Sequence, residues 1–176
     1  MRPRTRKALA LGCLATVAAA DLTLRRRKPP WIVVGLFDHP AHLATGALVA
    51  LNVRGRPKRW RQACLVGSLI ADVDHIPLAL RPELPTTDDP RPVSHCLLAV
   101  APVAAAAGLT QSERLHGLAT GMLAHYLRDV GVGSGVPLLW PLTSRSVKVP
   151  YAVYLAACLA LAARSAQVLP DGRHVR

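Results

Sequence analysis

The chain has 176 residues, a length that suits one domain. Hydrophobic residues make up 51% of the chain and aromatic residues only 4%, so its apolar mass is mainly Ala, Leu and Val, which favours packed helices over sheets. The formal net charge of +12 is concentrated in short blocks between apolar segments, and no RNA- or DNA-binding motif accompanies it. The composition therefore disfavours nucleic-acid binding and predicts an all-α, multi-helix integral membrane bundle.

The main basic blocks are residues 2–7, 25–28 and 54–61. Cationic blocks beside apolar helices are typical of cytoplasmic loops and of contacts with anionic lipid headgroups. Membrane lipid is therefore an expected partner. The expected headgroup contacts are the basic residues of the third block: Arg54, Arg56, Lys58, Arg59 and Arg61.

Residues 8–24 are apolar apart from Asp21 and follow a basic start, as in a secretory signal peptide. Residues 25–28 are basic where a signal peptide has small residues for cleavage, which favours a retained anchor helix. Because both flanks are basic, the charge rule does not orient this helix. We predict a basic N-terminus with an anchor helix (1–28), a membrane-embedded domain that carries the candidate site (29–163) and a polar tail (164–176).

Within the central domain, the sequence predicts a series of helices separated by loops. The helix that begins at Gln62 should end or kink near Pro77. Several segments are shorter than the roughly 20 residues that cross a bilayer core, so re-entrant or simply buried segments stay open as alternatives. The predicted elements are a short apolar run over 31–37, helices over 41–53, 62–80, 93–109, 115–130 and 151–163, loops over 54–61 and 81–92, a turn over 131–135 and a proline-bounded run over 136–142.

His125 and Asp129 are the clearest candidate functional residues. They are four residues apart on a predicted apolar helix, so both side chains project from one face. Ionisable groups in apolar surroundings cost several kcal/mol unless they find partners. The pair can supply two metal ligands, or one ligand and its orienting carboxylate; a metal-free ion pair is the alternative.

Ionisable residues occur within or beside apolar segments at three further positions in the sequence. Asp72, Asp74 and His75 fall within four residues, and a capping or loop-pairing role is the alternative for Asp74. His42 and His95 each begin an apolar segment, where a single histidine is more often a core residue. Together the clusters favour a metal site. His39 and His116 lie in more polar sequence and are left out, although His39 could replace a missing ligand.

The residue types indicate which metal the site would bind. The four cysteines are widely spaced and form no Cys-x-x-Cys pair, so nitrogen and oxygen atoms would hold the ion. Such ligands favour a divalent ion that activates water, zinc or manganese above all. Asp74 or Asp129 would accept the proton, and Arg91 or Arg128 would stabilise the developing negative charge, with an exposed salt bridge as the alternative role of each arginine.

Several of these motifs occur in the order found in a known family. Residues 41–43 (Ala-His-Leu), 69–75 (Leu-Ile-Ala-Asp-Val-Asp-His), 91–98 (Arg-Pro-Val-Ser-His-Cys-Leu-Leu) and 121–141, with His125-x3-Asp129 and Gly135-Val-Pro-Leu-Leu-Trp-Pro141, resemble the YdjM-like family. This resemblance implies a bacterial, multi-pass inner-membrane protein that binds LexA and is a metal-dependent hydrolase. The metal ligands that it implies are His42, Asp72, Asp74, His95, His125 and Asp129. The His-x3-Asp helices also look like those of zinc-dependent phospholipase C, which would suggest a phosphoester or lipid-like substrate.

The chain departs from the family pattern at two positions. Pro90-Arg91 stands where His-Arg is common, and Val132 stands where Thr is common after the last Asp. The sequence thus predicts a membrane-bound metal-dependent hydrolase. Two alternatives stay open: a catalytically degenerate binding or scaffold protein that retains its metal site, and a divalent-metal transporter.

Overall fold

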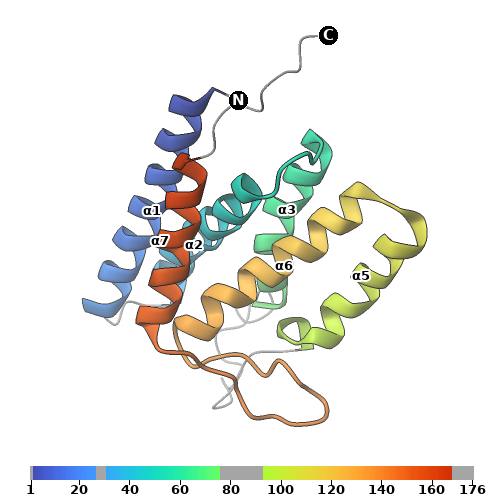
Figure 1. Cartoon of the computed structure of the whole chain (residues 1–176). Coiled ribbons are helices and arrows are strands. Elements are labelled where there is room, and N and C mark those ends of the chain that lie inside the picture. The colour runs from blue at the N-terminus through green and yellow to red at the C-terminus, as the bar shows by residue number, and fades with distance from the viewer. Residues whose placement is uncertain (1, 27–30, 76–92, 168–176) are drawn as a thin grey trace.

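The computed structural model describes residues 2–26, 31–75 and 93–167. Within these ranges there is no strand, only an isolated bridge between Val136 and Val147, so the all-α prediction is confirmed. The elements are the helices α1 (Pro3–Arg26), α2 (Trp31–Asn52), α3 (Lys58–Ile70), α5 (Leu97–Thr110), α6 (Glu113–Gly131) and α7 (Tyr151–Gln167), with the 3-10 turns η1 (Ala71–His75) and η2 (Val93–His95) (Figure 1).

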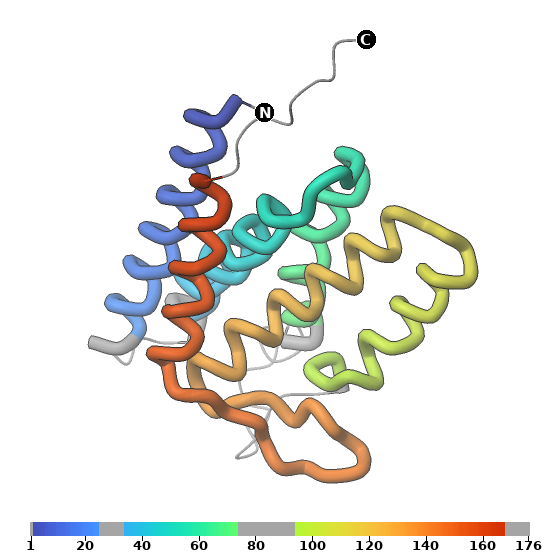
Figure 2. The backbone as a smooth tube through the Cα atoms, viewed as in Figure 1, coloured from blue at the N-terminus to red at the C-terminus, as the bar shows by residue number. Residues whose placement is uncertain are grey.

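The helices form two packed groups. α1, α2 and α7 lie side by side around an apolar cluster of small and medium-sized residues, with Val17, Leu48 and Tyr154 at its centre (Figures 1 and 2). α3 and α6 pack closely, and α5 covers α6 through a second cluster that includes Val100, Met122 and others from η1. α2 contacts both α3 and α6, so it joins the two groups.

The close approach of α3 and α6 depends on glycine. Gly117 and Gly121 are four residues apart on α6, and a Cβ atom at either would collide with a backbone carbonyl of α3, that of Trp60 or Cys64. Small residues at this spacing let helix backbones approach closely. The packing sets α6 beside the end of α3, where the chain turns into η1, and so places His125 next to Ser68.

Several predicted helix boundaries are wrong. The run over 31–37 and the helix over 41–53 form one helix, α2, which continues through Pro40. The helix predicted over 62–80 begins earlier, at Lys58, and its α-helical part ends at Ile70, where a 3-10 turn replaces it. α7 continues four residues beyond the predicted end at 163. Pro77 and the loop predicted over 81–92 lie outside the described residues.

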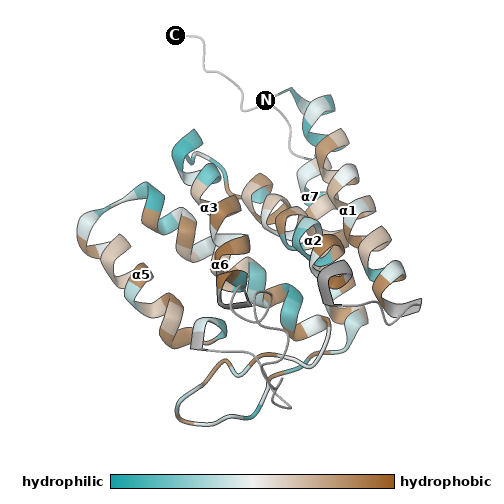
Figure 3. Ribbon diagram, turned by 180° about the vertical axis from the view of Figure 1, so that it is seen from behind, coloured by the Kyte–Doolittle hydropathy of each residue, from teal (hydrophilic) through white to brown (hydrophobic). Residues whose placement is uncertain are grey.

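Among the described helices, α1 is the one that is long and apolar enough to cross a membrane, over Pro3–Leu24. The predicted multi-pass bundle is therefore not established by helix length and composition. Figure 3 shows hydrophobic residues along α1 and α5, and hydrophilic residues at the starts of α1 and α3. The division into anchor, domain and tail stays a prediction.

Candidate metal centre

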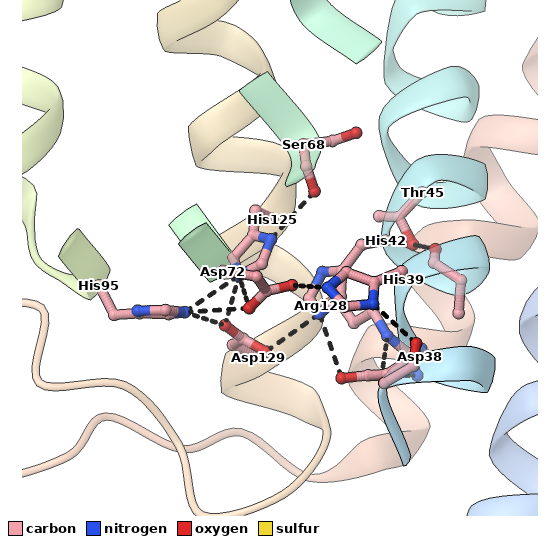
Figure 4. A network of polar contacts seen from close by, with 12 residues as sticks. Asp38, His39, His42, Thr45, Ser68, Asp72, His95, His125, Arg128 and Asp129 are labelled. Carbon is pink, nitrogen blue, oxygen red and sulfur yellow. Dashed lines mark hydrogen bonds and ion pairs between the residues drawn. The ribbon is translucent and has the colours of Figure 1, made fainter. Parts of the chain in front are cut away.

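Five ionisable side chains converge where α2, η1, η2 and α6 meet (Figure 4). Four of them are almost fully buried: His42, His95 and His125 are at most 1% exposed and Asp129 is 4% exposed. The Asp72 side chain, 14% exposed, completes the set. The structure therefore brings together five of the six predicted ligands: His42, Asp72, His95, His125 and Asp129.

Local helix geometry places the two carboxylates. His125 and Asp129 are one turn apart on α6, and His125 Nε2 lies 3.0 Å from Asp129 Oδ2. After α3 ends, the tighter turn η1 brings Asp72 to the same nitrogen, with Oδ1 3.5 Å from His125 Nε2 and 3.6 Å from His95 Nε2. Two carboxylates thus face one pair of histidines.

The hydrogen bonds of Nδ1 in His125 and His95 indicate which ring nitrogen of each carries the hydrogen. His125 Nδ1 lies 3.0 Å from the carbonyl oxygen of Ser68, which can only accept, so Nδ1 carries a hydrogen. Ser94 Oγ donates to the carbonyl of Ala71 and lies 2.9 Å from His95 Nδ1, so it can accept a hydrogen bond from that nitrogen. With the hydrogen on Nδ1, each neutral imidazole carries its lone pair on Nε2.

These two lone pairs point at each other. His95 Nε2 and His125 Nε2 are 3.2 Å apart, with Asp72 and Asp129 beside them. Two lone pairs and two carboxylates in a buried space repel each other unless a cation, either a proton or a metal ion, lies among them. Metal-bound histidines characteristically donate their other N–H to a carbonyl or similar group, as both histidines do here.

His42 adds a third imidazole. Its ring stacks on that of His125 with 3.8 Å between centroids, and its Nε2 lies 3.5 Å from Asp129 Oδ1. Two groups of residues could each hold a metal ion, His42–Asp72–His125 and His95–His125–Asp129, and the ligand atoms of each group lie within 4.8 Å of one another. Since His125 belongs to both groups, the arrangement suits one ion or two neighbouring ions.

The charges of the centre shift the pKa values of its members. Burial favours the neutral form of Asp72, but a hydrogen bond from His95 and the nearby His42 and His125 outweigh it and lower the pKa. Burial also favours neutral His125, but the hydrogen bond and negative charge of Asp129, with the charge of Asp72, raise the pKa of His125. These charges therefore favour the protonated form of His125 when no metal is bound.

A second buried network, not expected from the sequence, adjoins the centre. Arg128 is fully buried; its guanidinium contacts Asp38 at 2.6 Å and Asp21 at 2.9 Å, and Nη1 lies 3.3 Å from the hydroxyl of Tyr154. The prediction of an exposed salt bridge for Arg128 is therefore wrong. Asp38 also faces the centre, with Oδ2 3.4 Å from His42 Nε2. Its spacing from His42, i and i+4, is the sequence signal that could have identified it.

The other candidates fall outside this set. His39 Nε2 lies 3.4 Å from Asp72 Oδ2, but its side chain is 52% exposed, so it stands at the rim of the centre. Asp74 lies in η1, but its side chain, like the whole of Arg91, is outside the described residues, and their predicted roles stay predictions.

The fold and the centre define a class of protein: an all-helical chain whose buried histidine and aspartate groups could hold a metal ion. The family model described as YdjM inner membrane protein matches residues 37–172, so the chain belongs to that family, as the sequence motifs indicated. The match includes every residue of the centre and Asp38 but not α1. No curated protein and no solved structure matches the chain.

Proposed function

We propose that this protein is a membrane-bound, metal-dependent hydrolase whose divalent ion, zinc or manganese, lies among His42, Asp72, His95, His125 and Asp129. The observation that carries the proposal is the 3.2 Å approach of the His95 and His125 Nε2 atoms between two carboxylates. Imidazole and carboxylate ligands suit both metals. The inner-membrane description of the family supports the location.

A divalent ion held by such ligands supplies a water molecule that ionises near neutral pH. The residues around the ion would hold it in place and accept the proton that the water releases. Asp129 directs one oxygen to His42 and the other to His95 and His125, which suits a ligand that also accepts a proton. Asp74 is the other proposed acceptor, and Arg91 is the residue proposed to stabilise developing negative charge.

The proposed substrate is a phosphoester or a lipid-like molecule. Two considerations support it: membership of an inner-membrane family and the similarity of the His-x3-Asp helix to zinc-dependent phospholipase C. The exposed His39 beside Asp72 marks the side of the centre that is open to solvent. A substrate would approach from this side.

The first experiment is to measure the metal content of detergent-purified protein by plasma mass spectrometry. We expect about one or two equivalents of a single ion, lost in His125→Ala and in Asp72→Ala. His116→Ala is the matched control, because His116 is on the same helix but belongs to neither metal group. A folded wild-type protein without metal would contradict the proposal. Metal-loaded protein would then be assayed on a panel of phosphoesters.

The main alternative is a catalytically degenerate scaffold that retains the metal and acts through a protein partner, as the family resemblance to LexA-binding proteins suggests. Pro90, in place of the histidine common in the family pattern, favours it. The other departure, Val132, carries less weight, because this half-buried side chain follows α6 and packs against the apolar cluster of α1, α2 and α7. Stoichiometric metal without hydrolysis of any substrate on the panel would support this alternative. Metal-dependent flux into proteoliposomes would instead support a transporter.

A further inference from the structure

We propose that His42 is not a ligand of the metal but the residue that positions Asp129, through a hydrogen on Nε2 that the carboxylates of Asp129 and Asp38 share. This inference rests on the proposed metal centre and narrows its ligand set. It assigns a single ion to the side chains around the Nε2 atoms of His95 and His125.

The Nε2 atom of His42 faces two hydrogen-bond acceptors. It lies 3.4 Å from Asp38 Oδ2 and 3.5 Å from Asp129 Oδ1. Ionised carboxylates only accept hydrogen bonds, so both oxygens attract a hydrogen on Nε2 and repel a lone pair there. A hydrogen shared by two acceptors also accounts for distances longer than the roughly 2.9–3.0 Å of a single N–H···O bond. The surroundings of Nε2 therefore favour the tautomer that has its hydrogen on this atom.

The other ring nitrogen of His42 does not favour metal binding. Among the described residues, Nδ1 is buried and has no hydrogen-bond partner. A neutral imidazole has one N–H and one lone pair, so binding of a metal through Nε2 requires the hydrogen on Nδ1. This hydrogen would be a buried donor without an acceptor, which is unfavourable. With the hydrogen on Nε2, the single donor of the ring instead meets the carboxylates.

His42 differs in this respect from the two histidines whose Nε2 atoms are 3.2 Å apart. Nδ1 of His125 lies beside the carbonyl oxygen of Ser68, and Nδ1 of His95 lies beside Ser94 Oγ. Metal-bound histidines characteristically donate their outer N–H to such a partner, which fixes the ring and leaves the inner lone pair for the metal. Two of the three imidazoles thus have the outer partner of a ligand, and no described residue provides one for His42.

The two candidate metal groups also compete for one atom. Both contain His125, and the single lone pair on its Nε2 binds one ion. In the group His95–His125–Asp129 the separations from His125 Nε2 are 3.2 and 3.0 Å, and His95 Nε2 lies 3.6 Å from Asp129 Oδ2. Two ligands about 2.1 Å from a tetrahedral ion lie about 3.4 Å apart. We therefore expect one ion in this group, with Asp72 as the other nearby carboxylate.

The same geometry gives His42 its role. Asp129 directs Oδ2 to His95 and His125 and Oδ1 to His42 (Figure 4). Carboxylates that bind a metal are themselves oriented by hydrogen bonds from neighbouring groups. A hydrogen bond from His42 to Oδ1 would hold the plane of the carboxylate and leave Oδ2 for the ion. His42 would thus do for Asp129 what Ser94 does for His95.

His42 is itself held firmly enough for this role. Its ring stacks on that of His125, with 3.8 Å between centroids and 10° between the ring planes. Asp38, the second acceptor, is fixed by two hydrogen bonds from Arg128 to its other oxygen. A continuous series of contacts therefore leads from the buried guanidinium through Asp38 and His42 to Asp129.

Matched substitutions of a ligand and of the positioning residue test this assignment. Zn²⁺ affinity and stoichiometry would be measured by chelator competition on the detergent-purified full chain. Glutamine has an amide N–H as many bonds from Cα as Nε2 of histidine, but no imidazole lone pair. We expect His95→Gln to lose the ion and His42→Gln to keep one equivalent at near wild-type affinity. His42→Ala should keep one equivalent with affinity weakened by about 10- to 100-fold.

Nitrogen-15 NMR of the Zn²⁺-loaded protein, labelled at its histidines, reads the tautomers directly. We expect the hydrogen on Nε2 in His42 and on Nδ1 in His95 and His125, with the His42 signals identified by their loss in His42→Gln. A hydrogen on Nδ1 of His42, or loss of the ion from His42→Gln as complete as from His95→Gln, would overturn the inference. The wild-type tautomer decides the question even where a variant does not fold.

The outcome for the metal centre itself is separate. A wild-type protein that is folded by circular dichroism and binds no Zn²⁺ would contradict the proposed function, and the present inference with it. A wild-type protein that binds Zn²⁺ with His42 as a third imidazole ligand would contradict only the present inference. Binding of two equivalents by the wild type would also overturn it, because the arrangement inferred here holds a single ion.

Discussion

Arg128 and Asp38 form a two-point ion pair that joins α6 to α2 across 90 residues of sequence: Nε and Nη2 of Arg128 lie 3.0 and 2.6 Å from the same carboxylate oxygen of Asp38. The other oxygen of Asp38 faces His42 at 3.4 Å. Arg128 also binds Asp21 of α1. The pair therefore fixes His42 against the centre and connects the centre to the candidate membrane span.

Replacement of Arg128 by alanine should strongly destabilise the protein. The change leaves Asp38 and Asp21 buried without their cation, and breaking a buried ion pair from one side costs about 3–5 kcal/mol. Thermal unfolding in detergent measures the loss. Arg164→Ala is the control, since this exposed arginine should contribute less than about 0.5 kcal/mol. Equal melting temperatures for the two variants would show that the network carries little stability.

Gly121→Ala should separate α3 from α6. The added methyl group would meet the carbonyl of Cys64 and the backbone of Gly67 and Ser68, none of which can move without shifting α3. Overpacking of this kind costs about 1–3 kcal/mol or more. Because His125 is on α6 and Asp72 follows α3, the variant should also bind metal more weakly. Unfolding and metal titration measure the two effects.

Gly108→Ala is the matched control for this substitution. Gly108 is also helical, but a Cβ atom there meets no other atom within 4 Å. Alanine should be neutral or stabilise α5 by up to about 1 kcal/mol, because glycine is the poorer helix former. If Gly121→Ala behaved in the same way, α3 and α6 would not be in close backbone contact.

Metal affinity should fall as the pH is lowered, beginning above the ordinary histidine pKa. The pKa of His125 is raised from about 6.5, since the effect of Asp129 and Asp72 exceeds that of burial, so protons compete for Nε2 at higher pH than usual. The stability of the metal-free protein should change with pH in the opposite direction. The His125–Asp129 pair stabilises it fully below the unfolded pKa, and this stability is lost as pH rises through the raised folded value.

Chelator competition and thermal unfolding over a pH series would measure these two trends. His125→Ala provides the comparison, because the pH dependence of metal-free stability that comes from this pair should disappear in that variant. A metal-free wild-type protein whose stability rises through the same pH range would show that His125 is not held as the charged partner of Asp129.

The sequence identifies most of the centre because isolated polar residues in apolar segments are visible without a structure. His125 and Asp129 share a helix face by spacing alone, and the structure adds Asp72, His42 and His95 around them. Asp38 has the same spacing from His42, but the helix predicted over 41–53 does not include it, whereas α2 begins at Trp31 and continues through Pro40. A proline at this point removes one backbone donor, and packing of α2 between the other helices offsets that loss.

The role of Arg128 could not be read from the sequence. Its partners, Asp21 and Asp38, are on other helices far away in the sequence, and no local pattern encodes such contacts. The sequence also does not reveal that α3 ends at Ile70. Pro77 predicted a later end, but Asp72 reaches both histidines only because the chain leaves the α-helix before it.

Ser94→Ala tests whether the tautomer of His95 matters for metal binding. Ser94 Oγ accepts the Nδ1 hydrogen of His95 and so keeps the Nε2 lone pair directed at His125. Loss of such an outer partner typically weakens metal binding by about 10- to 100-fold. Chelator competition should show this decrease, with Ser134→Ala, an exposed serine after α6, as the unchanged control. Equal affinities in both variants would mean that His95 is not a ligand whose orientation depends on Ser94. A decrease in Ser94→Ala alone, without loss of thermal stability beyond about 1 kcal/mol, would assign the effect to ligand orientation and not to folding.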